Sequence, residues 1–133
     1  MILADTSAWI ELQRRTGSAV DERMAHLLEH GPLPTISEPV VMELLASRRS
    51  DEGVARIRQG LLAFEMLSVG GLATWERAAA IQRTCRLRGE TVRSIVDCLI
   101  AAVAIREGAT LLHRDRDFEV IARHTSLQIE SVA

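Results

Sequence analysis

The sequence contains no lysine, and all sixteen of its basic residues are arginine. This absence excludes classes of protein whose chemistry requires a lysine. Arginine suits bidentate contacts with phosphate, but a codon bias of the genome is a simpler explanation of the composition. The formal net charge of −2 does not by itself indicate a nucleic-acid-binding protein.

Cysteines and long hydrophobic runs are also scarce. Cys85 and Cys98 form no CxxC pair and have no histidine at the spacing of a zinc site. Both lie in apolar, helix-like surroundings, so we expect reduced core residues of a cytoplasmic protein. The apolar run from Cys98 to Ile105 is too short to span a bilayer. Because Asp5 interrupts the apolar N-terminus, we expect no secretory leader and no membrane association.

Length and composition fit one compact domain, which we expect to span residues 1–133. The chain is 47% hydrophobic and 26% charged, as in ordinary globular proteins. Short apolar segments alternate with segments of helical periodicity, which favours an α/β fold: a three-layer α/β/α sandwich with a central, mainly parallel sheet of four to five short strands. Strands are expected near residues 1–4, 35–36, 66–69, 110–112 and 127–129, and helices near 20–28, 37–45, 54–61, 72–87, 94–107 and 115–121.

One carboxylate interrupts an otherwise apolar stretch. Asp97 lies in the run from Ile95 to Ile105, whose other members are all hydrophobic. Burying an unpaired carboxylate is costly unless a cation, a proton or several donors accompany it. The run contains no basic residue, so the partner must come from elsewhere in the fold or from solution. A structural explanation is also open, because Ser94 lies three residues earlier, as in a capping box.

Four further acids stand where they can share such a partner. Asp5 ends the first predicted strand and Asp115 follows the fourth, so both are expected at the sheet edge where ligands bind. Glu43 borders the apolar face of its predicted helix, and Asp117 lies two residues after Asp115. Simpler explanations are helix N-caps for Asp5 and Asp115, a first-turn acid for Asp117, and a solvated surface residue for Glu43.

The acids together favour a metal site over separate coincidences. Mg²⁺ and Mn²⁺ prefer hard carboxylate oxygens and retain several waters. A metal held in this way lowers the pKa of a bound water and neutralises charge on a phosphodiester during hydrolysis. The sequence therefore predicts metal-assisted phosphodiester chemistry.

Four segments carry a resemblance to a known family. They are Asp5-Thr6-Ser7-Ala8-Trp9-Ile10-Glu11, Glu43-Leu44, Asp97-Cys98-Leu99-Ile100-Ala101-Ala102 and Leu111-Leu112-His113-Arg114-Asp115-Arg116-Asp117-Phe118. In this order and spacing they resemble PIN domains, and in particular VapC-type toxins. The resemblance covers the whole chain. It implies a Mg²⁺- or Mn²⁺-dependent endoribonuclease that is the toxin of a toxin–antitoxin pair and usually a homodimer.

The resemblance also implies roles for the acids. Asp5 and Asp97 match the principal metal ligands, Glu43 and Asp115 complete the acidic quartet, and Asp117 is an accessory acid; all five are predicted to be catalytic. Because such a site is anionic, we expect a small antitoxin to block it with a basic side chain, an arginine in the first instance.

The neighbouring residues are less informative. Many relatives carry Thr or Ser where this chain has His113, so this chain lacks a hydroxyl that could support a carboxylate or a water there, and a lone histidine is often structural. Arg93, Arg114 and Arg116 are candidates for binding RNA phosphates, with solvated surface or neutralisation of the acids as the alternative.

Three other classes of protein have requirements that can be compared with the same residues. A receiver domain needs a lysine near its last strands, and this chain has none. A phosphatase of the haloacid dehalogenase type needs a second aspartate two residues after Asp5, where the chain has Ser7. A PIN-like RNA-binding or scaffold module that does not cleave RNA is the remaining alternative. A protein that only binds phosphate would, however, bind it more tightly without these negative charges.

Overall fold

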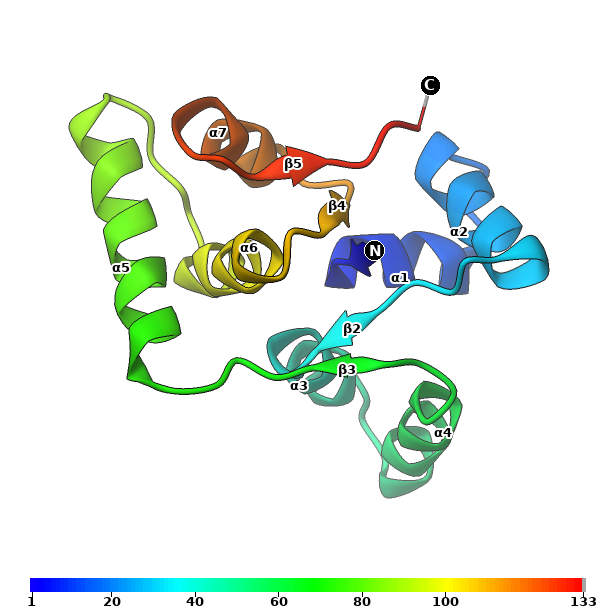
Figure 1. Cartoon of the computed structure of the whole chain (residues 1–133). Helices are drawn as coiled ribbons and strands as arrows, with labels where there is room; N and C mark the ends of the chain where they lie inside the picture. The colour runs from blue at the N-terminus through cyan, green and yellow to red at the C-terminus, as the bar shows by residue number, and fades with distance from the viewer. Residues whose placement is uncertain (133) are drawn as a thin grey trace.

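The computed structural model describes residues 1–132 and contains five short strands, all parallel to their neighbours (Figure 1). The first sheet has the order β1-β4-β5, with β1 at Ile2–Ala4, β4 at Thr110–Leu112 and β5 at Gln128–Ile129. The second pairs β2 (Ile36–Ser37) with β3 (Met66–Leu67). A parallel bridge between Leu3 and Thr35 joins them, giving the continuous order β3-β2-β1-β4-β5.

The bridge holds the two sheets together through backbone hydrogen bonds. The Ala4 N–H donates to the Thr35 carbonyl at 3.1 Å, and the Thr35 N–H donates to the Ile2 carbonyl at 2.8 Å. The predicted central sheet of four to five parallel strands is therefore confirmed. The predicted strand at 66–69 is shorter, because only Met66 and Leu67 pair with a neighbour.

Helices cover both faces of this sheet. Successive strand side chains point to opposite faces, and Leu3, Ala4, Leu111 and Leu112 are all completely buried. The α/β/α arrangement is thus confirmed. The helices are α1 (Thr6–Arg14), α2 (Ala19–His30), α3 (Glu38–Ala46), α4 (Asp51–Leu61), α5 (Leu72–Leu87), α6 (Ile95–Glu107) and α7 (Arg116–His124).

Four helices among the described residues begin at a residue whose side chain caps them, and α5, which follows Gly71, begins without such a cap. Asp5, Ser18, Ser50 and Asp115 accept hydrogen bonds from the first turns of the helices they precede. Ser94 occupies the N-cap position of α6, but its side chain makes no capping hydrogen bond, so the expected capping box is wrong. Ser37 before α3 behaves in the same way. Neither serine side chain therefore explains where its helix begins.

Helix α6 crosses the centre of the molecule and forms much of the core. Its residues from Asp97 to Ala104 are all buried, and α5 and α7 pack against it. Cys85 and Cys98 are free and buried, as expected. Among residues 1–132, no helix combines the length and the hydropathy required to cross a membrane.

Candidate active site

The sheet topology brings the first two acids together. Strands β1 and β4 are adjacent and parallel, with Ala4 opposite Leu112, so the residues that follow them lie at the same edge. The Asp5 N–H donates to the Leu112 carbonyl at 2.9 Å. Asp97 and Asp117 reach the same place from the first turns of α6 and α7.

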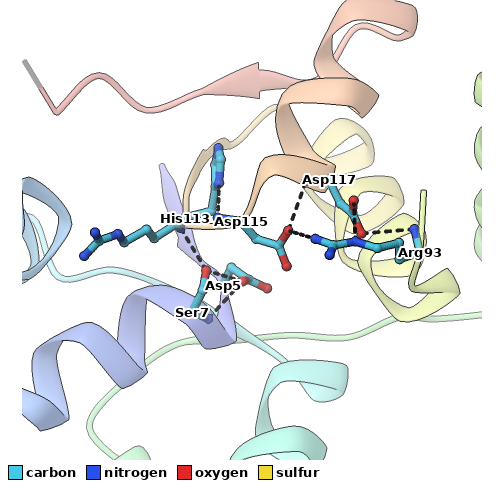
Figure 2. A network of polar contacts seen from close by, with 7 residues as sticks. Asp5, Ser7, Arg93, His113, Asp115 and Asp117 are labelled. Carbon is cyan, nitrogen blue, oxygen red and sulfur yellow. Dashed lines mark hydrogen bonds and ion pairs between the residues drawn. The ribbon is translucent and has the colours of Figure 1, made fainter. Parts of the chain in front are cut away.

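Asp5 presents one engaged and one free oxygen. Its Oδ2 accepts from the Ser7 N–H at 2.9 Å and from the Ser7 hydroxyl at 2.6 Å (Figure 2). Its Oδ1 is buried and has no hydrogen-bond partner within the part of the chain described. An orphaned buried carboxylate oxygen is costly unless a ligand satisfies it. Asp5 therefore caps α1 and at the same time leaves a ligand atom for a cation.

Asp97 is the buried charge at the centre of the cluster. The pKa of Asp97 is raised from 3.8 to about 8, chiefly by desolvation and then, in decreasing order, by the negative charges of Asp5, Asp115, Glu43 and Asp117. The pKa of Asp5 is raised to about 6, chiefly by burial and partly by Glu43. Each of the other four predicted acids therefore acts electrostatically on Asp97.

Three of these acids lie close enough to hold one ion. Asp97, Asp115 and Asp117 each offer an oxygen, and these oxygens lie within 4.8 Å of one another. These donors are hard carboxylate oxygens, the pKa of Asp97 is raised, and Asp5 Oδ1 nearby has no hydrogen-bond partner among the described residues. Such a site fits a divalent cation of the Mg²⁺ or Mn²⁺ type.

Glu43 belongs to the site and is not a plain solvated residue. Its Oε1 accepts from the Thr6 hydroxyl at 2.6 Å, across to the first residue of α1. The resemblance to the family includes Thr6 and Ser7 but predicts no role for either hydroxyl; the sequence signal that points to them is their position directly after Asp5.

Arg93 is the cation that approaches the acids from the protein. Its backbone N–H donates to Asp117 Oδ2 at 3.1 Å, its Nε lies 3.5 Å from Asp117 Oδ1, and its Nη2 lies 3.9 Å from Asp115 Oδ1 (Figure 2). The side chain is 68% exposed, so water screens this pairing. Arg93 therefore reaches the outer side of the cluster, beyond Asp115 and Asp117.

His113 organises the turn after β4. Its Nδ1 accepts a hydrogen bond from the Asp115 N–H at 3.0 Å, and its Nε2 lies 3.1 Å from Glu119 Oε1. The ring packs on Phe118, with centroids 5.2 Å apart. Burial lowers the pKa of His113, which agrees with a neutral ring that accepts at Nδ1 and donates at Nε2.

Comparison with known proteins places this chain in a family. A sequence model of the PIN domain matches residues 2–124. Ribonuclease VapC11 of Mycobacterium tuberculosis is 46% identical over 132 residues, or 98% of each chain. VapC ribonuclease Mb1587 of Mycobacterium bovis gives the same values. VapBC2 from Rickettsia felis, solved with a DNA fragment from its promoter, shares the fold with a TM-score of 0.73 at 20% identity, over 98% of each chain.

Proposed function

The chain belongs to the PIN domain family, and on that premise we propose that it is an endoribonuclease acting as the toxin of a toxin–antitoxin pair. The resemblance seen in the sequence to PIN domains is confirmed. We propose that residues 1–133 form one nuclease domain and that the protein acts in the cytoplasm. The convergence of acids around the buried Asp97 is the observation that carries the proposed activity.

We propose Mg²⁺ or Mn²⁺ as the cofactor, with Asp5 and Asp97 as principal ligands. When bound, such an ion supplies an activated water and neutralises charge on the phosphodiester. Ser7 fixes the Asp5 carboxylate through Oδ2, and the buried Oδ1, which has no hydrogen-bond partner among the described residues, would be available to hold the ion. Asp115 and Asp117 complete the acidic group from the turn that His113 organises, and Glu43 completes it from α3.

An antitoxin that inhibits this site must compensate its negative charge. We propose that a small partner inserts a basic side chain among Asp5, Glu43, Asp97 and Asp115, where an arginine makes charge-assisted hydrogen bonds. The solved structures with this fold include toxin–antitoxin complexes, such as VapBC-1 from nontypeable Haemophilus influenzae. A complex with no basic group of the partner near these acids would refute the proposal.

An apolar groove supports the proposal of a homodimer. Trp75 and Met42 are 52% and 55% exposed, and both line a groove of about 610 Å³ with Val96 and Leu99. Large exposed apolar surfaces of this kind mark interaction sites. Replacing Trp75 with Glu should convert a dimer to monomers in sedimentation experiments, and an unchanged mass would contradict this interface.

Cleavage assays with purified protein test the activity. We expect RNA to be cut with Mg²⁺ or Mn²⁺ and to stay intact with EDTA. Asp5→Asn and Asp97→Asn should abolish cleavage while circular dichroism shows an unchanged fold, because each keeps the side-chain shape but removes a charged ligand oxygen. Binding of RNA without cleavage by the wild type would instead support a scaffold module, and near wild-type cleavage by both variants would refute the assignment.

A further inference from the structure

We propose that Arg93 and Arg116 form a subsite for one phosphate of the RNA strand beside the acidic centre. The inference rests on the proposed ribonuclease function and adds the place where the strand is held next to the cleaved bond. Both residues line a hollow of about 330 Å³ between residues 89–93 and the first turns of α7. Thr91, which also lines it, is exposed and offers a hydroxyl donor.

The two arginines line this hollow from different elements. Arg93 lies in the segment before α6, and Arg116 is the first residue of α7. Both are exposed, so a ligand from solution can approach them. A guanidinium presents a planar fork of donors that matches phosphate oxygens in two parallel hydrogen bonds.

The negative charges around the hollow already have partners. Glu90 accepts from Arg123 Nε at 3.1 Å and lies 2.7 Å from His124 Nε2. Asp117 accepts from the Arg93 N–H and pairs with its guanidinium. Arg116, by contrast, forms no ion pair with any residue in the range 1–132. Among the described residues that line the hollow, Arg116 is therefore the guanidinium left free for a phosphate, while Arg93 already shares its charge with Asp117 and Asp115.

Arg114 is distinguished from these two arginines by its contacts. Its guanidinium is paired with Glu11, and its backbone N–H donates to the Ser7 hydroxyl at 2.9 Å. These bonds tie the turn after β4 to α1. We therefore assign Arg114 to holding the turn in place and leave it out of the phosphate subsite, although the sequence suggested all three.

The hollow is continuous with the acidic centre. Asp117 and Arg93 belong to both, and Arg93 spans from Asp117 toward Asp115 (Figure 2). A strand whose scissile phosphate lies at the acids can therefore place a neighbouring phosphate between Arg93 and Arg116. Holding that phosphate offsets the repulsion that the acids exert on the strand.

The test measures RNA binding separately from cleavage. Anisotropy of a short fluorescent single-stranded RNA is followed in EDTA over a salt titration, for the wild type, Arg116→Ala and Arg116→Lys. Arg56→Ala is the matched control, because Arg56 is an exposed arginine on α4, at the opposite end of the molecule from α7 (Figure 1). Steady-state cleavage with Mg²⁺ or Mn²⁺ gives kcat and KM for the same proteins.

We expect Arg116→Ala to weaken RNA binding several-fold and to lower the slope of log K against log salt by about 0.7, the value for one phosphate contact on a single strand. KM should rise with little change in kcat, and Arg116→Lys should lie between the two because it keeps the charge and loses the fork. Equal affinity and slope for Arg116→Ala and Arg56→Ala would overturn the subsite, as would a wild type that binds no RNA. A wild type that binds RNA but never cleaves it would overturn the proposed function instead.

Discussion

The backbone N–H of Asp115 is held by the imidazole Nδ1 of His113 at 3.0 Å, two residues earlier in the same turn. A serine or threonine hydroxyl makes the same local bond in many turns. The histidine makes it with a ring that is only 6% exposed and that also reaches Glu119 at 3.1 Å. His113 therefore positions Asp115 through a hydrogen bond to its backbone N–H.

Replacing His113 with Ala should lower cleavage by about 10–100-fold, the usual cost of removing a residue that orients a metal ligand. His113→Asn should recover much of this loss, since its amide oxygen accepts from an N–H two residues further on. The measurements are kcat, KM and the Mn²⁺ concentration for half-maximal activity.

His30→Ala, an exposed histidine on α2, is the control for this series. If the Asn and Ala variants at position 113 are folded and equally inactive, the hydrogen bond to Asp115 is not what matters there.

Ser7 supports Asp5 in the way that His113 supports Asp115, which allows a comparable prediction. Its hydroxyl donates to Asp5 Oδ2 at 2.6 Å and accepts from the Arg114 N–H at 2.9 Å. Ser7→Ala should reduce kcat by about tenfold and lower the free energy of unfolding by only about 1 kcal/mol. Ser7→Thr should retain activity because it keeps the hydroxyl. Unaltered kcat in Ser7→Ala, with Ser131→Ala as reference, would show that Asp5 needs no such support.

The fold followed from the sequence where local signals were strong. The helix predicted at 72–87 is found at Leu72–Leu87, between Gly71 and the turn at Gly89. Helix α7 runs three residues further than expected, to His124, because the chain becomes extended only at Thr125. The strand predicted at 66–69 is longer than the observed strand, Met66–Leu67. The observed strand is short because it pairs with β2, which is itself only two residues long.

The candidate site could also be predicted in part, where its signals are local in the sequence. A charge inside an apolar helix and acids at strand ends are visible along the chain, and the structure brings those acids together. Their catalytic roles stay a prediction. The contacts of Thr6 with Glu43 and of Ser7 with Arg114 could not be predicted, because they depend on side-chain directions between elements distant in sequence. The bonds between His113 and Asp115 and between Ser7 and Asp5 are local, but they depend on rotamers that the sequence alone does not specify.

Divalent metal should stabilise the folded protein. Mg²⁺ or Mn²⁺ binds the assembled acids and not the unfolded chain, so saturating metal should raise the melting temperature by several degrees. NaCl at matched ionic strength should not reproduce the shift, and Asp5→Asn should reduce it. Identical melting curves in EDTA and in excess metal would argue against a metal site.

Asp97→Asn should make the metal-free protein more stable at neutral pH, and the effect should depend on pH. Because the pKa of Asp97 is raised from 3.8 to about 8, the folded state holds its proton more tightly than the unfolded chain does. Stability present at acid pH is therefore lost as the pH rises from 3.8 toward 8. Asparagine cannot ionise, so this loss disappears in the variant.

We expect a gain of about 1–2 kcal/mol for Asp97→Asn in EDTA at neutral pH, and a gain near zero once the pH falls to the unfolded pKa. A lost helix-dipole contact opposes it by roughly 0.3–1 kcal/mol. Asp51→Asn controls for that contact, since Asp51 is an exposed first-turn acid of α4. Thermal unfolding over a pH series measures all three proteins. A wild type more stable than Asp97→Asn at neutral pH, by a pH-independent margin equal to that of Asp51→Asn, would make Asp97 a structural acid of its helix and nothing more.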